Sequence, residues 1–160
     1  MSIQVGEKVP ESTLMRMTDA GPAAITTREV FEGKKVVLFA VPGAFTPTCS
    51  TKHLPGYVQQ AASIKAKGVD TIVCLAVNDA FVMHHWGQSQ GAGDSILMLA
   101  DGNGELTKKL GLERDASKFG MGIRSQRFSM IVENGVVKEL NVESPGEFKV
   151  SSAESTICQL

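Results

Sequence analysis

Cys49 ends a short, conformationally restricted loop with the sequence VPGAFTPTCS, residues 41–50. Pro42 and Pro47 each fix a backbone angle and lack an N–H donor, so the loop is stiff. Thr46 stands three residues before Cys49, near enough along the chain for its hydroxyl to reach the sulfur or a ligand on it. Thiol chemistry requires a nucleophile held rigidly beside hydrogen-bond donors. These residue types at these spacings therefore favour a reactive thiol.

The stretches on either side of this loop place Cys49 at the start of a helix. The run KKVVLFAV (34–41) has the β-branched, apolar character of a strand buried in a sheet, and residues 50–68 have a helical pattern that ends at Gly68. The first turn of a helix offers unpaired N–H groups and the positive end of the helix dipole, and both favour thiolate over thiol. The alternative is a buried structural cysteine at a strand–helix turn. The prolines and the threonine favour the reactive thiol.

Strand-like and helix-like patterns alternate along the rest of the chain. We expect buried strands at 70–77 and 95–101, helices at 80–90 and 105–112, a β-hairpin at 127–143 that turns at Asn134–Gly135, and a capped C-terminal helix within 151–160. Pro55–Gly56 predicts a kink or a break in the helix at 50–68. This order of elements predicts an α/β fold in which helices flank a central mixed sheet.

The composition bounds the class of protein. A length of 160 residues is typical of one domain, and a formal net charge of −1 argues against nucleic acid or an anionic membrane as the main partner. No apolar run has the length of a membrane span. Three cysteines, an odd and sparse count, predict a reducing, cytoplasmic compartment rather than a secreted disulfide framework. The N-terminal residues show no signal-peptide pattern, and a cleaved organelle-targeting segment stays open.

The spacing Pro42–x3–Thr46–x2–Cys49 resembles the active-site motif of the peroxiredoxin family. The string VPGAFTPTCSTKHLPGY resembles the type II, or peroxiredoxin-5-like, subgroup, and the glutaredoxin-linked enzymes more than the animal form. The resemblance extends through GVDTIVCLAVNDAFVM, LADGNGE, RSQRFSMIVENG and NVESPGEFKVSSA. It implies a single thioredoxin-fold domain over residues 1–160. It also implies a thiol-dependent peroxidase for hydrogen peroxide and alkyl hydroperoxides, with roles in antioxidant defence and redox homeostasis.

The same resemblance implies a role for each site residue. Cys49 would be the peroxidatic cysteine, whose thiolate attacks a hydroperoxide and becomes a sulfenic acid. Thr46 would hydrogen-bond the peroxide, and Pro42 would shield the pocket from water. Arg127, in RSQRF, matches the family's arginine, which stabilises the thiolate and the charge on the leaving oxygen. Without the resemblance, Arg127 would be interpreted as a surface residue at a strand start; Arg124 is expected only to flank the pocket.

The resemblance leaves the reduction of the sulfenic acid open. Type II relatives carry a cysteine at the position of Cys74, which makes it a candidate resolving cysteine, although a cysteine in a strand is commonly a small core residue. Cys74 and Cys49 would have to move to bring their Cα atoms within the roughly 7 Å that a disulfide needs. Cys158 matches the animal form's resolving cysteine poorly. We therefore expect an external thiol, glutathione with glutaredoxin or thioredoxin, as the reductant, and no metal or organic cofactor.

The family also implies a homodimer, for which PGAFTP, Trp86 and FGMGI offer apolar surface. Two other classes of function are weighed against the peroxidase. His53 lies four residues after Cys49 and would share its face on a regular helix, as in a Cys–His acyl-transfer enzyme, but no third orienting group is evident. We therefore expect His53 to have a structural role. The second class is a redox-sensing or chaperone-like binding module whose thiol only reports oxidation.

Overall fold

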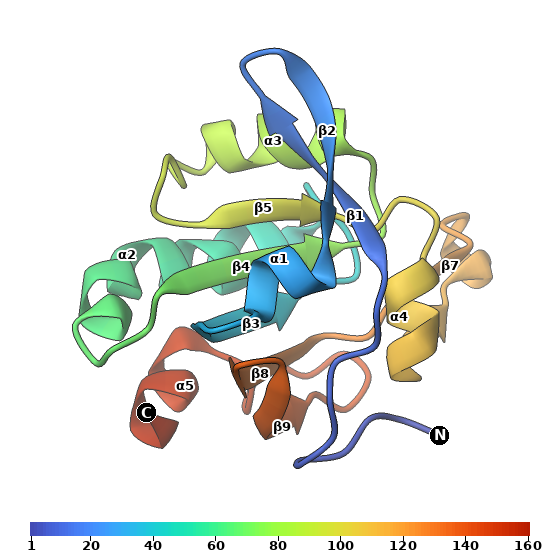
Figure 1. Ribbon diagram of the computed structural model, residues 1–160. Helices are drawn as coiled ribbons and strands as arrows, with labels where there is room; N and C mark the ends of the chain where they lie inside the picture. The colour runs from blue at the N-terminus through green and yellow to red at the C-terminus, as the bar shows by residue number, and fades with distance from the viewer.

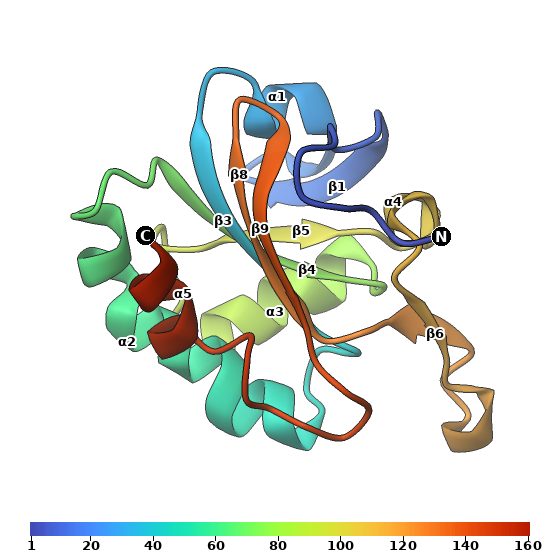
Figure 2. The same ribbon diagram turned by 90° about the horizontal axis from the view of Figure 1, so that it is seen from below.

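The computed structural model describes residues 1–160, and its centre is a seven-stranded mixed sheet with helices on both faces (Figures 1 and 2). The strands lie in the order β2-β1-β5-β4-β3-β8-β9. Their bounds are β1 Thr13–Thr18, β2 Gly21–Thr26, β3 Lys35–Ala40, β4 Thr71–Ala76, β5 Leu97–Ala100, β8 Phe128–Glu133 and β9 Val136–Val142. β3, β4 and β5 are parallel, and the remaining pairs are antiparallel. The order of elements predicts this central mixed sheet flanked by helices, and its thioredoxin-like arrangement is the one that the resemblance implies.

The helices cover the two faces of the sheet unequally. One face packs against α2 (Leu54–Lys65), α3 (Ala80–Ser89) and α5 (Ala153–Gln159), and the other against α1 (Thr27–Phe31) and α4 (Glu105–Leu110). Alternate residues of β3 therefore enter different cores: Phe39 lies in the first and Leu38 in the second. Because both faces are covered, β3 and β4 are apolar on both sides, which is why they read as continuous hydrophobic runs.

The predicted helix at 50–68 is divided in the structure. Cys49–His53 form a single π-helical turn, η1, in which the N–H of Leu54 donates to the carbonyl of Cys49, and α2 begins at Leu54. Pro55 occupies the first turn of α2, where its missing N–H costs no helical hydrogen bond. His53 and Leu54 both keep right-handed helical angles, so the helix changes its hydrogen-bonding pattern just before Pro55 and is not broken there. The break expected at Pro55–Gly56 is therefore wrong.

The C-terminal predictions are confirmed. β8 and β9 form the expected hairpin, and Asn134 and Gly135 turn it with φ angles of 48° and 81°, as a two-residue turn of the type I′ kind requires. The side chain of Ser152 caps α5 by accepting the N–H of Ser155. None of the helices combines the length and the apolar character that crossing a bilayer requires.

The sequence pattern did not predict the elements in two parts of the fold, the N-terminal third and the segment around residues 113–125. β1 and β2 form a hairpin, and α1 begins with a capping box between Thr26 and Glu29. A second small sheet consists of β6 (Glu113–Asp115) and β7 (Ile123–Ser125), which flank a 3₁₀ turn at Ser117–Phe119. β6 and β7 are only three residues long, and β1 and β2 each have a single buried residue, so none of the four shows a clear alternation in the sequence.

Candidate active site

Cys49 lies at the carboxyl end of β3, where the loop that follows the strand enters η1. Its side chain is fully buried, and it is the first residue of the π-helical turn. The loop is fixed from outside by Asn78, whose side-chain oxygen accepts the N–H of Ala44 at 3.0 Å. Within the loop, Phe45 adopts a φ of 65°, a left-handed conformation that is costly for a bulky residue and persists only where the surroundings enforce it. The stiffness expected of this loop is therefore present.

Thr46 lies directly against the sulfur. Its hydroxyl oxygen is 2.8 Å from Sγ of Cys49 and 2.7 Å from the carbonyl oxygen of Gly43. A hydroxyl carries a single hydrogen, so it donates to only one of these two partners at a time. The hydroxyl can therefore donate to a thiolate, or donate to Gly43 and accept a hydrogen bond from a group bound at the sulfur.

Arg127 reaches the same sulfur from the strand that pairs with β3. It directly precedes β8, and its Nη2 donates to Sγ of Cys49 at 3.0 Å. Its Nη1 lies 2.8 Å from Nδ1 of His53. The register that pairs Ala40 with Phe128 brings this end of β8 beside the loop after β3. The arginine identified by resemblance thus lies where a positive charge can stabilise a thiolate.

His53 is buried and neutral, and it does not contact the sulfur. Its Nε2 lies 3.0 Å from the carbonyl oxygen of Ser151, so Nε2 carries the proton and Nδ1 accepts from Arg127. Burial, together with the neighbouring positive charge of Arg127, lowers the pKa of His53 to about 3. Both ring nitrogens are therefore engaged, and neither is free to act as the base that a Cys–His acyl-transfer enzyme needs. The expected structural histidine is what the geometry shows.

A cavity of about 310 Å³ borders this centre, and Arg127 lines it. Pro42 and Thr48 from the active-site loop also line it, together with mostly charged and polar residues that include Glu143. Pro42 is half-buried, and its ring has no N–H to offer a water molecule. Arg124, which was expected to flank the pocket, donates through Nε to the carbonyl of Met121. A Cβ on Gly43 would lie only 3.1 Å from Nη1 of Arg124, so a larger residue there would require this side chain to shift by a few tenths of an ångström.

The other two cysteines have different surroundings. Cys74 is fully buried in β4, on the same face of the sheet as Cys49, and burial raises the pKa of its thiol well above the ordinary value. Cys158 is exposed on α5. All three cysteines are free thiols in this structure.

Three supporting contacts were not anticipated from the sequence. Trp86, which was expected to offer apolar surface, is fully buried, and its Nε1 donates to the hydroxyl of Ser50 at 3.0 Å. Asn78 holds the loop, and Glu143 is a buried carboxylate close to Ser151. Each comes from an element distant in sequence. The position of Ser50 directly after Cys49 was the one local sign that Ser50 belongs to the site. No local pattern indicated that Trp86 would donate to it.

The centre as a whole can support nucleophilic attack by sulfur. Two donors, the hydroxyl of Thr46 and the guanidinium of Arg127, converge on Sγ, and a third group, the buried His53, orients the guanidinium. Donors fixed in advance around a buried thiolate stabilise charge in the transition state without reorganising.

Comparison with known proteins agrees with this geometry. Residues 4–157 match the family model described as Redoxin. Peroxiredoxin-2E-2, a chloroplastic protein of Oryza sativa subsp. japonica, is 51% identical over 161 residues, which cover 98% of this chain and 72% of the relative. Peroxiredoxin-2C of Arabidopsis thaliana is 46% identical, covering 97% of this chain and 96% of the relative. The crystal structure of reduced Prx3 from Vibrio vulnificus in complex with hydrogen peroxide superimposes with a TM-score of 0.95, at 55% identity over 98% of each chain.

The fold and the family match define a thioredoxin-like protein of the redoxin class. Within that class, the chain belongs to the peroxiredoxins, of the type II or peroxiredoxin-5-like kind. It is a thiol peroxidase with an antioxidant role, as the resemblance in sequence indicates.

Proposed function

We propose that Cys49 is the peroxidatic nucleophile of this peroxidase. Its thiolate attacks the terminal oxygen of a hydroperoxide, an S–O bond forms, and the O–O bond breaks. The sulfur is oxidised to a sulfenic acid, and the peroxide is reduced to water or an alcohol once the leaving oxygen has taken a proton. The observation that carries the proposal is the convergence of Thr46 and Arg127 on one buried sulfur, at 2.8 and 3.0 Å.

The donors around the sulfur have separate tasks in this proposal. Arg127 places a fixed positive charge beside the thiolate and beside the oxygen on which charge develops. Thr46 changes its hydrogen-bond partner between Gly43 and the reacting atoms. Pro42 excludes water from the side of the cavity. The reaction uses only side chains of this chain and needs no metal or organic cofactor.

We infer that an external thiol reduces the sulfenic acid. Cys74 is fully buried in a strand, Cys158 is exposed on the last helix, and neither forms a disulfide with Cys49. Glutathione with glutaredoxin, or thioredoxin, is the reductant we propose. Cys74 stays the candidate for an internal disulfide, which would require local unfolding of η1 or β4.

We further propose a homodimer that works in a reducing compartment. Phe45 is 56% exposed on the active-site loop, and Phe119 is 65% exposed in the 3₁₀ turn, so both offer apolar area to a second copy. Sedimentation at working concentration tests this, and a monodisperse monomer would contradict it. Peroxiredoxin-2E-2 of rice is a chloroplastic protein; the compartment of this chain is a prediction that localisation of the tagged full-length protein tests.

Peroxide consumption under three reductant systems tests the assignment of the cysteines. The systems are glutathione with glutaredoxin, thioredoxin with its reductase, and dithiothreitol alone, each with wild type, Cys49→Ser, Cys74→Ser and Cys158→Ser. We expect turnover to require Cys49 only. Turnover that also requires Cys74 or Cys158 would establish an internal disulfide cycle. One oxidation per molecule, with no turnover under any reductant, would instead favour a redox sensor.

A further inference from the structure

Glu143 is a buried carboxylate that the proposed reaction steps do not use. It directly follows β9 and is only 5% exposed. Its two oxygens accept the N–H of Lys149 at 2.9 and 2.8 Å, and one of them also accepts the N–H groups of Val150 and Ser151, both at 2.9 Å, and the hydroxyl of Ser151 at 2.7 Å. Burial alone would raise the pKa of Glu143, but these hydrogen bonds outweigh burial and hold that pKa below its usual value.

The segment that Glu143 holds leads directly to the active site. The carbonyl of Ser151 accepts from Nε2 of His53 at 3.0 Å and from the hydroxyl of Tyr57 at 2.9 Å. Because this carbonyl takes the proton-bearing nitrogen, Nδ1 of His53 is left to accept from Nη1 of Arg127. The other arm of the same guanidinium then donates to Sγ of Cys49.

The backbone of Glu143 closes this path into a ring. Its N–H donates to the carbonyl of Arg127 at 2.9 Å. Glu143 therefore holds Arg127 at both ends, by its own N–H at the backbone and through Ser151 and His53 at the guanidinium. A planar guanidinium with two fixed partners has little freedom to turn away from the sulfur.

We propose that Glu143 is a positioning residue for the peroxidase reaction. It fixes the carbonyl of Ser151, which fixes the tautomer of His53, which aims Arg127 at the sulfur of Cys49. This inference rests on the proposed role of Arg127. It assigns a function in catalysis to a residue whose side chain makes its hydrogen bonds to residues 149–151 and none to the thiol.

Rapid-mixing kinetics of the reduced enzyme with hydrogen peroxide test the proposal through a double-mutant cycle of Glu143→Gln and Arg127→Gln. Glutamine keeps the size of the side chain, but it is neutral and turns an NH₂ group toward N–H donors. We expect Glu143→Gln alone to lower the second-order rate constant about 10- to 100-fold, as small misplacements of a reacting group do. In the Arg127→Gln background, the same change should cost less than about twofold. If the fold-losses of the two single variants multiply in the double variant, the two residues act independently, and the proposal is wrong.

A second readout separates aiming from general loss of structure. Alkylation of Cys49 by iodoacetamide uses the same thiolate but places no charge on a leaving oxygen, so it depends less on Arg127. Glu143→Gln should therefore lower the rate with peroxide more than the rate with iodoacetamide. Equal losses in both rates would show that Glu143 only supports the fold.

Controls keep the outcome interpretable. Glu133→Gln changes a carboxylate that is 47% exposed and pairs only with Lys35, and it should leave both rates unchanged. If Glu143→Gln does not fold, Ser151→Ala removes one hydrogen bond to Glu143 while keeping the backbone, and a loss of about threefold, absent in the Arg127→Gln background, is expected. An unchanged rate in Arg127→Gln itself would refute the proposed function; a large loss there with none in Glu143→Gln would refute only this inference.

Discussion

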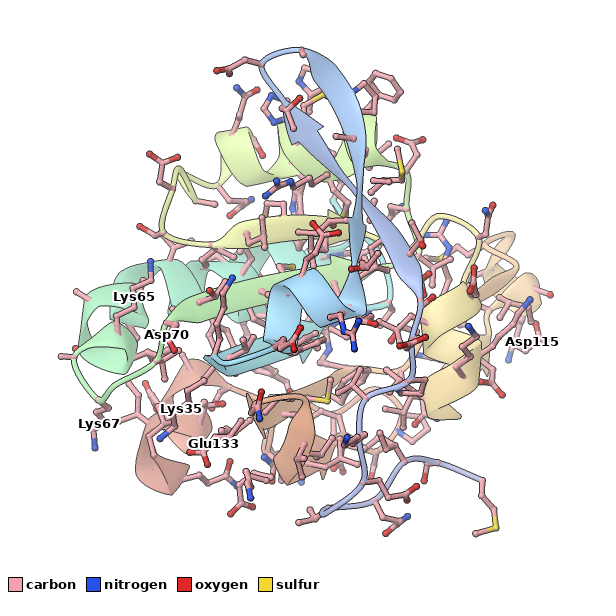
Figure 3. All side chains as sticks on the ribbon, in the orientation of Figure 1. Lys35, Lys65, Lys67, Asp70, Asp115 and Glu133 are labelled. Atoms are coloured by element: carbon pink, nitrogen blue, oxygen red, sulfur yellow. The ribbon has the colours of Figure 1, made fainter.

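The two ends of the β3–β8 pair carry charged groups in opposite surroundings. At one end, Arg127 joins Cys49 and His53, both of which are fully buried. At the other end, Lys35 faces Glu133 across the same pair of strands at 3.6 Å, with side chains 27% and 47% exposed. Figure 3 shows this second end, where Lys35 and Glu133 lie near Lys65, Lys67 and Asp70.

The difference shows what burial adds to similar chemical groups. The exposed end has one ion pair, between Lys35 and Glu133, and water competes for both charges, so the pair contributes little. At the buried end water is largely excluded, and the same attraction is several times stronger. The buried end also needs more support: His53 and Glu143 satisfy groups that water would otherwise solvate. The cation at the buried end contacts the sulfur of Cys49, whereas the cation at the other end pairs with a partly exposed carboxylate.

Removing the cation at each end should give the largest contrast. Arg127→Gln is expected to lower kcat/KM for hydrogen peroxide by about 10²- to 10³-fold, the usual cost of losing a donor that stabilises transition-state charge. Lys35→Gln, the matched change at the exposed end, should leave it unchanged. Initial rates with a saturating reductant measure both variants. A loss of less than threefold in Arg127→Gln would remove the functional distinction between the two ends.

The buried histidine should make the free energy of unfolding depend on pH. The pKa of His53 is about 3 in the folded state against 6.5 when exposed, so between these values the unfolded chain binds a proton that the folded chain does not. Stability from this residue is therefore present above pH 6.5 and is lost as the pH falls toward 3. Between about pH 7 and about pH 5 the loss is about 2 kcal/mol.

Urea denaturation at these two pH values measures that loss. In His53→Gln the difference between the two pH values should shrink by about 2 kcal/mol, even though the variant is less stable overall. His85→Gln, which changes an exposed histidine on α3, is the control and should keep the difference. An unchanged pH dependence in His53→Gln would mean that His53 is not buried as a neutral group.

Removing the hydroxyl beside the sulfur should have a smaller effect than removing the arginine. Thr46→Val keeps the shape of the side chain and is expected to lower kcat/KM for peroxide about tenfold, the equivalent of ~1.4 kcal/mol. Thr71→Val, a change at the start of β4 near the exposed end, should have no effect on the rate. If both variants keep the wild-type rate, the 2.8 Å contact between Thr46 and Cys49 does not contribute to the reaction.

The exposed ion pair should have the smallest effect of all. Glu133→Gln breaks the contact with Lys35, and we expect the free energy of unfolding to change by less than about 0.5 kcal/mol. Raising the salt concentration to about 1 M should erase even that difference, because the charges are then screened. Chemical denaturation at low and high salt provides the measurement. A loss above about 2 kcal/mol would show that this end is energetically like the buried one.

Much of the active site could be predicted because it is local in the chain. Pro42, Thr46 and Cys49 lie in one short loop, so their spacing follows from the backbone itself. The strands on either side were predicted because, buried on both faces, they read as continuous apolar runs. The hairpin at Asn134–Gly135 was predicted because few residues besides glycine and asparagine adopt the positive φ angles of its turn.

The sequence by itself singled out Cys49 as the candidate nucleophile and predicted its stiff loop and the alternation of strands and helices, and the resemblance to peroxiredoxins added Arg127. Only the tertiary structure decided which groups meet at the sulfur. Arg127 reaches Cys49 across 78 residues of chain, and Ser151 reaches His53 across 98. Such contacts depend on the register of β3 with β8 and on the course of the segment after β9, which no local pattern encodes. For the same reason, the sequence alone does not distinguish Glu143 from the exposed acidic residues, although the fold buries it.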